Sequence, residues 1–175
     1  MITAVDTNVL LDVLLADERF LESSIKSLEE ASREGDLIIC EAVMAELASA
    51  FMRSGREESE LFSFLSDLGI ELVPSGAEVA IRAAEAWSEY VRGVGVICPG
   101  CGEVFDVRCP SCGRSISWRQ HVITDFLIGA HASVHAGRLL TRDRGYYRSY
   151  FPELEVVYRW EGWSKGSSHQ GRRSS

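Results

Sequence analysis

Short apolar segments alternate with longer amphipathic segments along most of this chain. The short segments are rich in β-branched and other apolar residues, as buried strands are. The longer segments repeat apolar residues every three or four positions, which is typical of helices. Five strands are predicted in this way: residues 2–5, 37–40, 70–73, 139–140 and 154–158. Because strands and helices alternate, we predict an α/β fold with a central parallel sheet.

For three of the predicted helices, the sequence also indicates which side faces the core or where the helix ends. In the helix expected from Glu41 to Phe51, the predicted core side consists of Val43, Leu47, Ala50 and Phe51. A longer helix follows Gly76, and its predicted core side consists of Ala77, Ala80, Ile81, Ala84, Trp87 and Val91. The third helix runs from Thr124 to Gly137, and this glycine is a predicted C-terminal cap.

Length and composition indicate one domain of ordinary size with a small appendage. The chain has 175 residues, and 46% of them are hydrophobic, which argues against disorder. Its apolar runs are too short to cross a membrane and no signal peptide opens the sequence, so we expect a cytoplasmic protein without a membrane partner. The tail, residues 163–175, is rich in Gly, Ser and Arg and is predicted to be flexible.

Residues 94–119 interrupt the helical patterning and contain four of the five cysteines. They form two C-x-x-C pairs, each followed by glycine: Cys98, Cys101, Cys109 and Cys112. Two such pairs complete a tetrahedral site of four thiolates, so we predict a structural Zn²⁺ ion in a small zinc-ribbon-like insert. Thiol redox chemistry is the alternative, but an insert this small could hardly fold without a metal. Three roles for the insert remain open: binding RNA through charge and stacking, docking a protein, and stabilising the fold. The RNA contacts would come from Arg108, Arg114, Trp118 and Arg119.

Four acidic residues occupy positions that this architecture would bring together. Asp6 and Asp143 each follow a predicted strand, Asp125 begins a helix, and Glu46 lies in the middle of one. Each has an ordinary alternative, because Asp6 and Asp125 could cap helices and Glu46 could face solvent. Four carboxylates in one pocket would repel one another, and proteins keep such clusters mainly to hold hard divalent cations. The formal net charge of −8 is unusual for a nucleic-acid-binding protein, but bound divalent metals would cancel part of it locally.

Several short motifs together resemble those of a PIN-domain ribonuclease of the VapC type. The motifs are Val5 to Leu10, Ala45 to Leu47, Thr124 to Ala132 and Leu140 to Asp143, with a further likeness to VapC-type toxins from Tyr147 to Pro152. The resemblance implies a three-layer α/β/α fold over residues 1–162, interrupted by the cysteine insert. It also implies a metal-dependent endoribonuclease.

The resemblance assigns roles to individual residues. It implies that the catalytic residues and ligands of Mg²⁺ or Mn²⁺ are Asp6, Glu46, Asp125 and Asp143. A metal held by these carboxylates lowers the pKa of a bound water, which attacks the phosphodiester in line. Thr7 and Thr141 match polar positions that could steer this water or a phosphate. Asn8 could support the site or cap a helix, and Arg142 could contact an RNA phosphate or lie in solvent.

The partners implied are RNA, an antitoxin protein and, for the toxin type, a second copy in a homodimer. Two other functions remain open: an endonuclease that matures ribosomal RNA, and a PIN-like scaffold that docks a partner through its zinc insert. Glu41 and Asp12 stay outside the predicted site, because Glu41 suits a helix N-terminus and Asp12 should point elsewhere. His131 and His135 are spaced to share a metal, yet we expect hydrogen-bonding or surface roles for them.

Overall fold

The computed structural model describes residues 1–93, 96–97, 104–105, 107–116 and 122–158. Its centre is a five-stranded sheet in which every pairing is parallel. The strands, in spatial order, are β3 (Ile70–Leu72), β2 (Asp36–Ile39), β1 (Ile2–Val5), β8 (Arg138–Leu140) and β9 (Glu155–Val157). The predicted α/β fold with a central parallel sheet is therefore confirmed.

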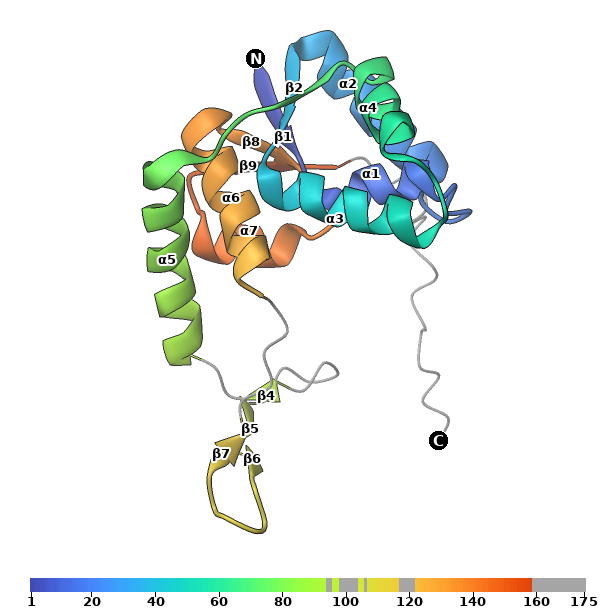
Figure 1. The fold of residues 1–175 in the computed structure, drawn as a ribbon. Helices are drawn as coiled ribbons and strands as arrows, with labels where there is room; N and C mark the ends of the chain where they lie inside the picture. The colour runs from blue at the N-terminus through green and yellow to red at the C-terminus, as the bar shows by residue number, and fades with distance from the viewer. Residues whose placement is uncertain (94–95, 98–103, 106, 117–121, 159–175) are drawn as a thin grey trace, which may run out of the picture.

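Seven helices of the described chain flank this sheet on two sides (Figure 1). They are α1 (Thr7–Leu14), α2 (Leu21–Glu34), α3 (Glu41–Arg53), α4 (Glu58–Asp67), α5 (Gly76–Gly93), α6 (Ile123–His135) and α7 (Arg144–Tyr150). Helix α2 packs against β2 and β8, and α6 packs against β1 and β8. Helix α7 was not among the predicted helices.

The core side of α3 is as predicted, with Val43, Leu47, Ala50 and Phe51 all buried. The core side predicted for α5 is wrong. Its buried residues are Val79, Ala83, Ala86 and Tyr90, whereas Ala77, Ala80, Ile81, Ala84 and Val91 are exposed and Trp87 is half-buried. Tyr90 packs against Phe126 and Tyr150, with ring centroids 5.3 and 5.7 Å away. A large aromatic side chain fixes the rotation of a helix more firmly than alanines, which bury little apolar area.

At two positions of the predicted third helix, the structure shows why the residue is glycine. A Cβ at Gly129 would lie 2.3 Å from the buried Phe151 ring, so only glycine lets α6 approach that ring. Gly137 has φ +77° and donates its N–H to the Ala132 carbonyl at 2.7 Å, which confirms the predicted C-terminal cap.

The insert contributes two small antiparallel pairs to the described chain. Strand β4 (Val96–Ile97) pairs with β5 (Val104–Phe105), and β6 (Val107–Arg108) pairs with β7 (Ser115–Ile116). The predicted ligands Cys98 and Cys101, and the tail 163–175, lie outside the described residues.

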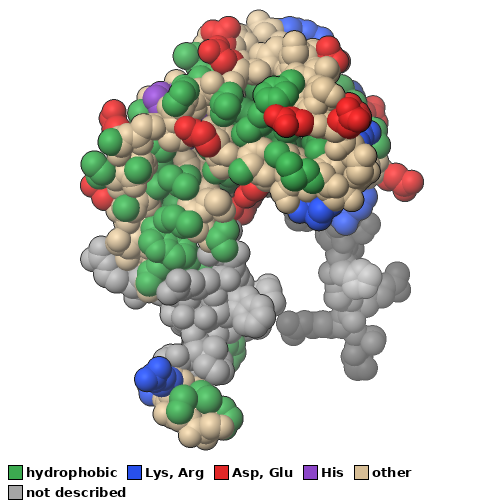
Figure 2. Space-filling model, viewed as in Figure 1, with side chains coloured by type: hydrophobic (Ala, Val, Ile, Leu, Met, Phe, Trp, Pro, Cys, Tyr) green, Lys and Arg blue, Asp and Glu red, His purple; other side chains and the backbone are tan. Residues whose placement is uncertain are grey.

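The surface carries scattered acidic side chains and, between them, patches of apolar side chains on the face shown in Figure 2. Across the part of the chain that the structure describes, no helix is long and apolar enough to cross a membrane.

Candidate active site

Asp6 lies where the carboxyl ends of β1 and β8 meet. Val5 is in register with Leu140, and the backbone N–H of Asp6 donates to the Leu140 carbonyl at 3.0 Å. The pairing therefore brings Thr141 beside Asp6, and its hydroxyl donates to Asp6 Oδ2 at 2.5 Å. Asp6 occupies the N-cap position of α1, but its side chain makes no capping hydrogen bond. The Asp6 carboxylate therefore accepts a hydrogen bond from the residue after β8 and does not cap α1.

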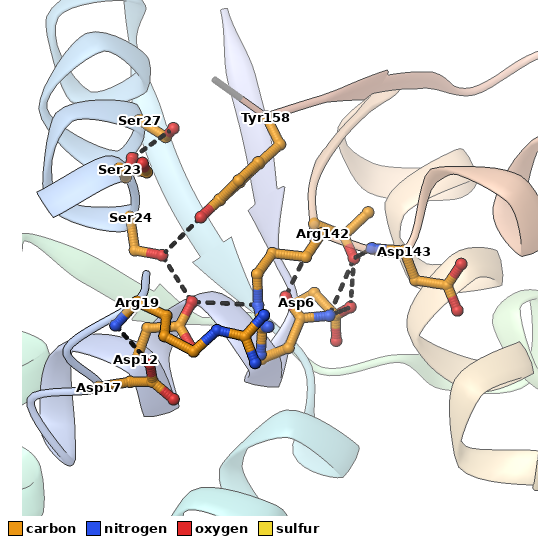
Figure 3. A network of polar contacts seen from close by, with 12 residues as sticks. Asp6, Asp12, Asp17, Arg19, Ser23, Ser24, Ser27, Arg142, Asp143 and Tyr158 are labelled. Atoms are coloured by element: carbon orange, nitrogen blue, oxygen red, sulfur yellow. Dashed lines mark hydrogen bonds and ion pairs between the residues drawn. The ribbon is translucent and has the colours of Figure 1, made fainter. Parts of the chain in front are cut away.

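Asn8 connects the two strand ends through its side-chain amide. Its Nδ2 donates to Asp6 Oδ2 at 2.5 Å and to Thr141 Oγ1 at 3.1 Å. Its Oδ1 accepts the backbone N–H of Arg142 at 3.2 Å. The backbone N–H of Asp143 in turn donates to Thr141 Oγ1 at 3.0 Å. This network, visible around Asp6 in Figure 3, fixes the loop after β8 relative to Asp6.

Glu46 reaches the same place from α3. The Thr7 hydroxyl donates to Glu46 Oε2 at 2.5 Å, although 39 residues separate the two in the sequence. The Glu46 side chain is half-buried, so it is not the fully solvated helix residue of the alternative interpretation. Thr7 thus positions Glu46 in the way that Thr141 positions Asp6.

The pKa of Asp6 is affected by its burial and by its acidic neighbours. Burial is the main reason that the pKa of Asp6 rises from 3.8 to about 6, and the charges of Asp125 and Glu46 raise it further. Hydrogen bonds from the Thr141 hydroxyl and the Thr7 backbone oppose the shift. Asp6 makes no ion pair with any described residue. A buried carboxylate among other carboxylates is costly for the fold, and a bound cation would remove that cost.

The other two predicted acids, Asp125 and Asp143, have different surroundings. Asp125 lies in the first turn of α6, where its Oδ2 accepts the Val122 backbone N–H at 2.9 Å, so it also caps the helix. Asp143 is exposed, and its carboxylate points away from the Arg142 guanidinium in Figure 3. Within the described ranges, no three His, Cys, Asp or Glu side chains are close enough together to enclose a metal ion. The charges of Glu46 and Asp125 act on Asp6, whereas Asp143 is connected to Asp6 through its backbone N–H and Thr141.

The two acids left out of the predicted site have other partners. Glu41 accepts the Ser75 hydroxyl at 2.5 Å and the Ser75 backbone N–H at 3.1 Å. Asp12 is buried, accepts the Ser24 hydroxyl at 2.6 Å and forms an ion pair with Arg142 at 3.1 Å (Figure 3). Sequence reasoning missed this ion pair. The available signal was a charged residue among the apolar positions of a short helix.

His131 fulfils the hydrogen-bonding role that we expected. It is buried on α6, and its Nε2 lies 2.9 Å from the Val73 carbonyl oxygen. Burial lowers its pKa, which favours the neutral ring. The His135 ring is 4.7 Å away between centroids.

The second C-x-x-C pair folds as a tight turn. The Cys109 N–H donates to the Arg114 carbonyl at 2.8 Å, and the Gly113 N–H donates back to the Cys109 carbonyl at 2.9 Å. Gly113 has φ +69°, a conformation that favours glycine. Hydrogen bonds from the backbone of Cys112 and Ser111 lower the pKa of the Cys109 thiol. The turn therefore stabilises the thiolate, the form that binds metals.

The fold and the site define a class of protein: an α/β protein with a parallel sheet and acidic side chains gathered at the carboxyl edge of its central strands. Residues 3–152 match the family model of the PIN domain, and the chain belongs to that family.

Solved structures of similar fold come from bacterial protein complexes. VapBC2 from Rickettsia felis, bound to a DNA fragment from its promoter, has a TM-score of 0.61 and 21% identity, and the match covers 91% of this chain and 100% of that one. A toxin-antitoxin complex from Klebsiella pneumoniae has a TM-score of 0.57 and 16% identity, covering 89% and 95%. FitAcB from Neisseria gonorrhoeae has a TM-score of 0.51 and 22% identity, covering 89% and 96%. A search of curated proteins found no match.

Proposed function

We propose that this chain is a metal-dependent endoribonuclease that acts as the toxin of a toxin-antitoxin pair. The observation that carries the proposal is Asp6: a buried carboxylate, without an ion pair to a described residue, whose pKa is raised to about 6. Two of the three other predicted acids, Glu46 and Asp125, contribute to that shift. Membership of the PIN-domain family supports a nuclease with the same site.

The donor set fits Mg²⁺ or Mn²⁺, because hard divalent cations prefer carboxylate oxygens and would offset the repulsion at Asp6. The residues that would hold the metal are Asp6, Glu46, Asp125 and Asp143. When bound, such an ion lowers the pKa of a water and neutralises charge on the scissile phosphodiester.

The surrounding side chains hold these acids in place. Thr141 and Asn8 both donate to Asp6 Oδ2, which fixes the orientation of its carboxylate. Thr7 does the same for Glu46. The Asn8 and Thr141 contacts to the backbone of Arg142 and Asp143 hold the loop that carries the fourth acid. Hydrogen bonds of this kind reduce the reorganisation needed when substrate binds.

The proposed partners are RNA as substrate and an antitoxin protein as inhibitor. Support for the antitoxin comes from the solved structures of similar fold, which include a toxin-antitoxin complex and VapBC2. We further propose that residues 1–162 form the nuclease domain, with residues 94–119 as an insert.

Replacement of Asp6 tests the nuclease proposal. We expect Asp6→Asn to lower Mn²⁺-dependent cleavage of a fluorogenic single-stranded RNA by about a thousandfold or more. The melting temperature should not fall, because the variant removes a buried charge. Glu41→Gln is the matched control: Glu41 also begins a helix but is bonded to Ser75, and cleavage should persist. Undiminished cleavage by Asp6→Asn would contradict the mechanism.

The cysteine turn supports a second element of the proposal, a structural Zn²⁺ ion held by Cys98, Cys101, Cys109 and Cys112. Elemental analysis of the purified full-length chain should find one zinc per chain, and Cys109→Ser should reduce that content. Cys40→Ala is the control, because Cys40 is a buried core thiol, as predicted, and should not affect zinc. A folded preparation without zinc would rule out the four-cysteine site.

A further inference from the structure

Phe20, in the connection between α1 and α2, has two arginines against its ring. The guanidinium carbon of Arg142 lies 4.1 Å from the ring centroid, and that of Arg19 lies 5.1 Å from it. Both distances are within the range of cation–π contacts. The two positive groups come from segments more than a hundred residues apart in the sequence, and both contact the same half-buried ring.

Arg142 is held on a second side by a buried carboxylate. Its Nε lies 3.1 Å from Asp12 Oδ2, and the Asp12 side chain is only 3% exposed. The same oxygen accepts the Ser24 hydroxyl at 2.6 Å, and Ser24 Oγ lies 3.2 Å from the Tyr158 hydroxyl. Figure 3 shows this chain of contacts running from Tyr158 to Arg142. The ring and Asp12 thus fix the guanidinium, and its two Nη groups hydrogen-bond no described residue.

This arginine pair adjoins the acidic edge. Arg142 stands between Thr141 and Asp143 in the sequence, and Asn8 accepts its backbone N–H. In Figure 3 its side chain and the Asp143 carboxylate point in opposite directions from the loop. Asn8 joins the backbone of Arg142 to the Asp6 carboxylate, so an RNA strand that extends past Asp6 on the Arg142 side of the loop can reach this guanidinium.

The proposed function leaves one requirement unmet, which the arginine pair can supply. The chain has a net charge of −8 and its proposed catalytic edge is acidic, so an RNA strand needs positive contacts nearby. Guanidinium groups bind phosphate through planar, paired hydrogen bonds, and a fixed guanidinium loses little entropy on binding. We propose that Arg19 and Arg142, seated on Phe20, bind a backbone phosphate of the RNA strand next to the nucleotide that is cleaved. This inference rests on the proposed ribonuclease function.

Arg19→Ala tests the phosphate site, because Arg19 is exposed and its side chain has no ion pair with a described residue. With the full-length protein, Mn²⁺ and a single-stranded RNA, we expect KM to rise about fivefold at low salt while kcat is unchanged. The slope of log(kcat/KM) against log[salt] should become shallower by about 0.7, the value for one phosphate of a single strand. Phe20→Leu should change KM in the same direction.

Arg33→Ala is the matched control. Arg33 is exposed in the last turn of α2, just before β2 begins. It therefore lies near the amino ends of the strands, whereas Asp6 follows the carboxyl end of β1. It should change neither KM nor the salt slope. Arg19→Ala behaving like Arg33→Ala would overturn the phosphate site, as would a fall in kcat with KM unchanged.

Two further outcomes separate this inference from others. A wild-type chain that cleaves no RNA would overturn the proposed function and this inference together, whereas normal cleavage with an unaffected Arg19→Ala variant overturns the inference alone. Unchanged RNA kinetics combined with loss of binding to a poly-glutamate peptide would assign the arginine pair to an acidic protein partner instead.

Discussion

Asp6 directly precedes the short helix α1 and Asp12 lies within it, and both are buried aspartates with a raised pKa. Burial is the main cause in both cases. A hydroxyl hydrogen bond lowers the pKa of each, from Thr141 at Asp6 and from Ser24 at Asp12. The neighbouring charges differ: those of Asp125 and Glu46 raise the pKa of Asp6 further, whereas that of Arg142 lowers the pKa of Asp12 by more than Asp17 raises it. Among the residues that the structure describes, Asp12 has a cationic partner and Asp6 has none.

This difference separates a carboxylate with a structural role, Asp12, from the one that we propose as a metal ligand, Asp6. A buried charge that the protein itself neutralises contributes to the architecture, here by holding Arg142 at the loop after β8. A buried charge surrounded by acids stays unfavourable until a ligand supplies the opposite charge. Strongly perturbed groups of the second kind mark candidate functional sites.

The pH dependence of stability gives the sharpest contrast and the largest expected effect on folding. The pKa of Asp6 is about 6 in the fold against an ordinary value of 3.8, so the folded state binds its proton more tightly than the unfolded state. Its contribution to stability is therefore present below about pH 4 and is lost as pH rises through 6. The shift corresponds to about 3 kcal/mol.

Urea unfolding from pH 3.5 to 7.5, without added Mg²⁺ or Mn²⁺, measures this contribution. Asp6→Asn does not titrate at this position, so it should become more stable than the wild type by up to about 3 kcal/mol as pH rises through the window. A stability difference independent of pH would mean that Asp6 is not held in an unfavourable charged state.

The fold could be predicted well from the sequence, because the strands and most helices follow the periodicity of apolar residues. Helix α7 was missed and the rotation of α5 was wrong. In α5 many alanines made several faces look equally apolar, and the contacts of Tyr90 with Phe126 and Tyr150 decided between them. Such contacts depend on the packing of segments far apart in the chain.

For the candidate site, the sequence predicted a set of acids and polar neighbours but not the hydrogen bonds that connect them. The Thr7–Glu46 and Asn8–Arg142 contacts depend on side-chain directions that spacing does not encode. The Asp12–Arg142 ion pair was missed for the same reason. The place of Asp12 in the helix was a reason to leave it out of the proposed metal site, but it did not predict that Arg142 is its partner.

Arg142→Gln should leave Asp12, like Asp6, as a buried carboxylate without a cationic partner among the described residues. Removing the guanidinium leaves a buried charge without its cation, and we expect a loss of about 1 to 2 kcal/mol at pH 7. Loss of Arg142 should raise the pKa of Asp12 further, so the destabilisation should disappear as pH falls below about 4. Adding Asp12→Asn to this variant should recover most of the loss, which a double-mutant cycle in urea measures.

Arg82→Gln is the control for this cycle. Arg82 also pairs with an acid, Glu153 at 2.8 Å, and lies 5.1 Å from the centroid of the Phe151 ring. Glu153 has a side chain that is 49% exposed, however, so water can replace the lost cation and the cost should stay below about 1 kcal/mol. Equal losses for the two arginine variants, with no pH dependence in either, would show that burial of Asp12 is not what distinguishes its ion pair. The contrast with Asp6 would then depend on the acidic neighbours of Asp6 alone.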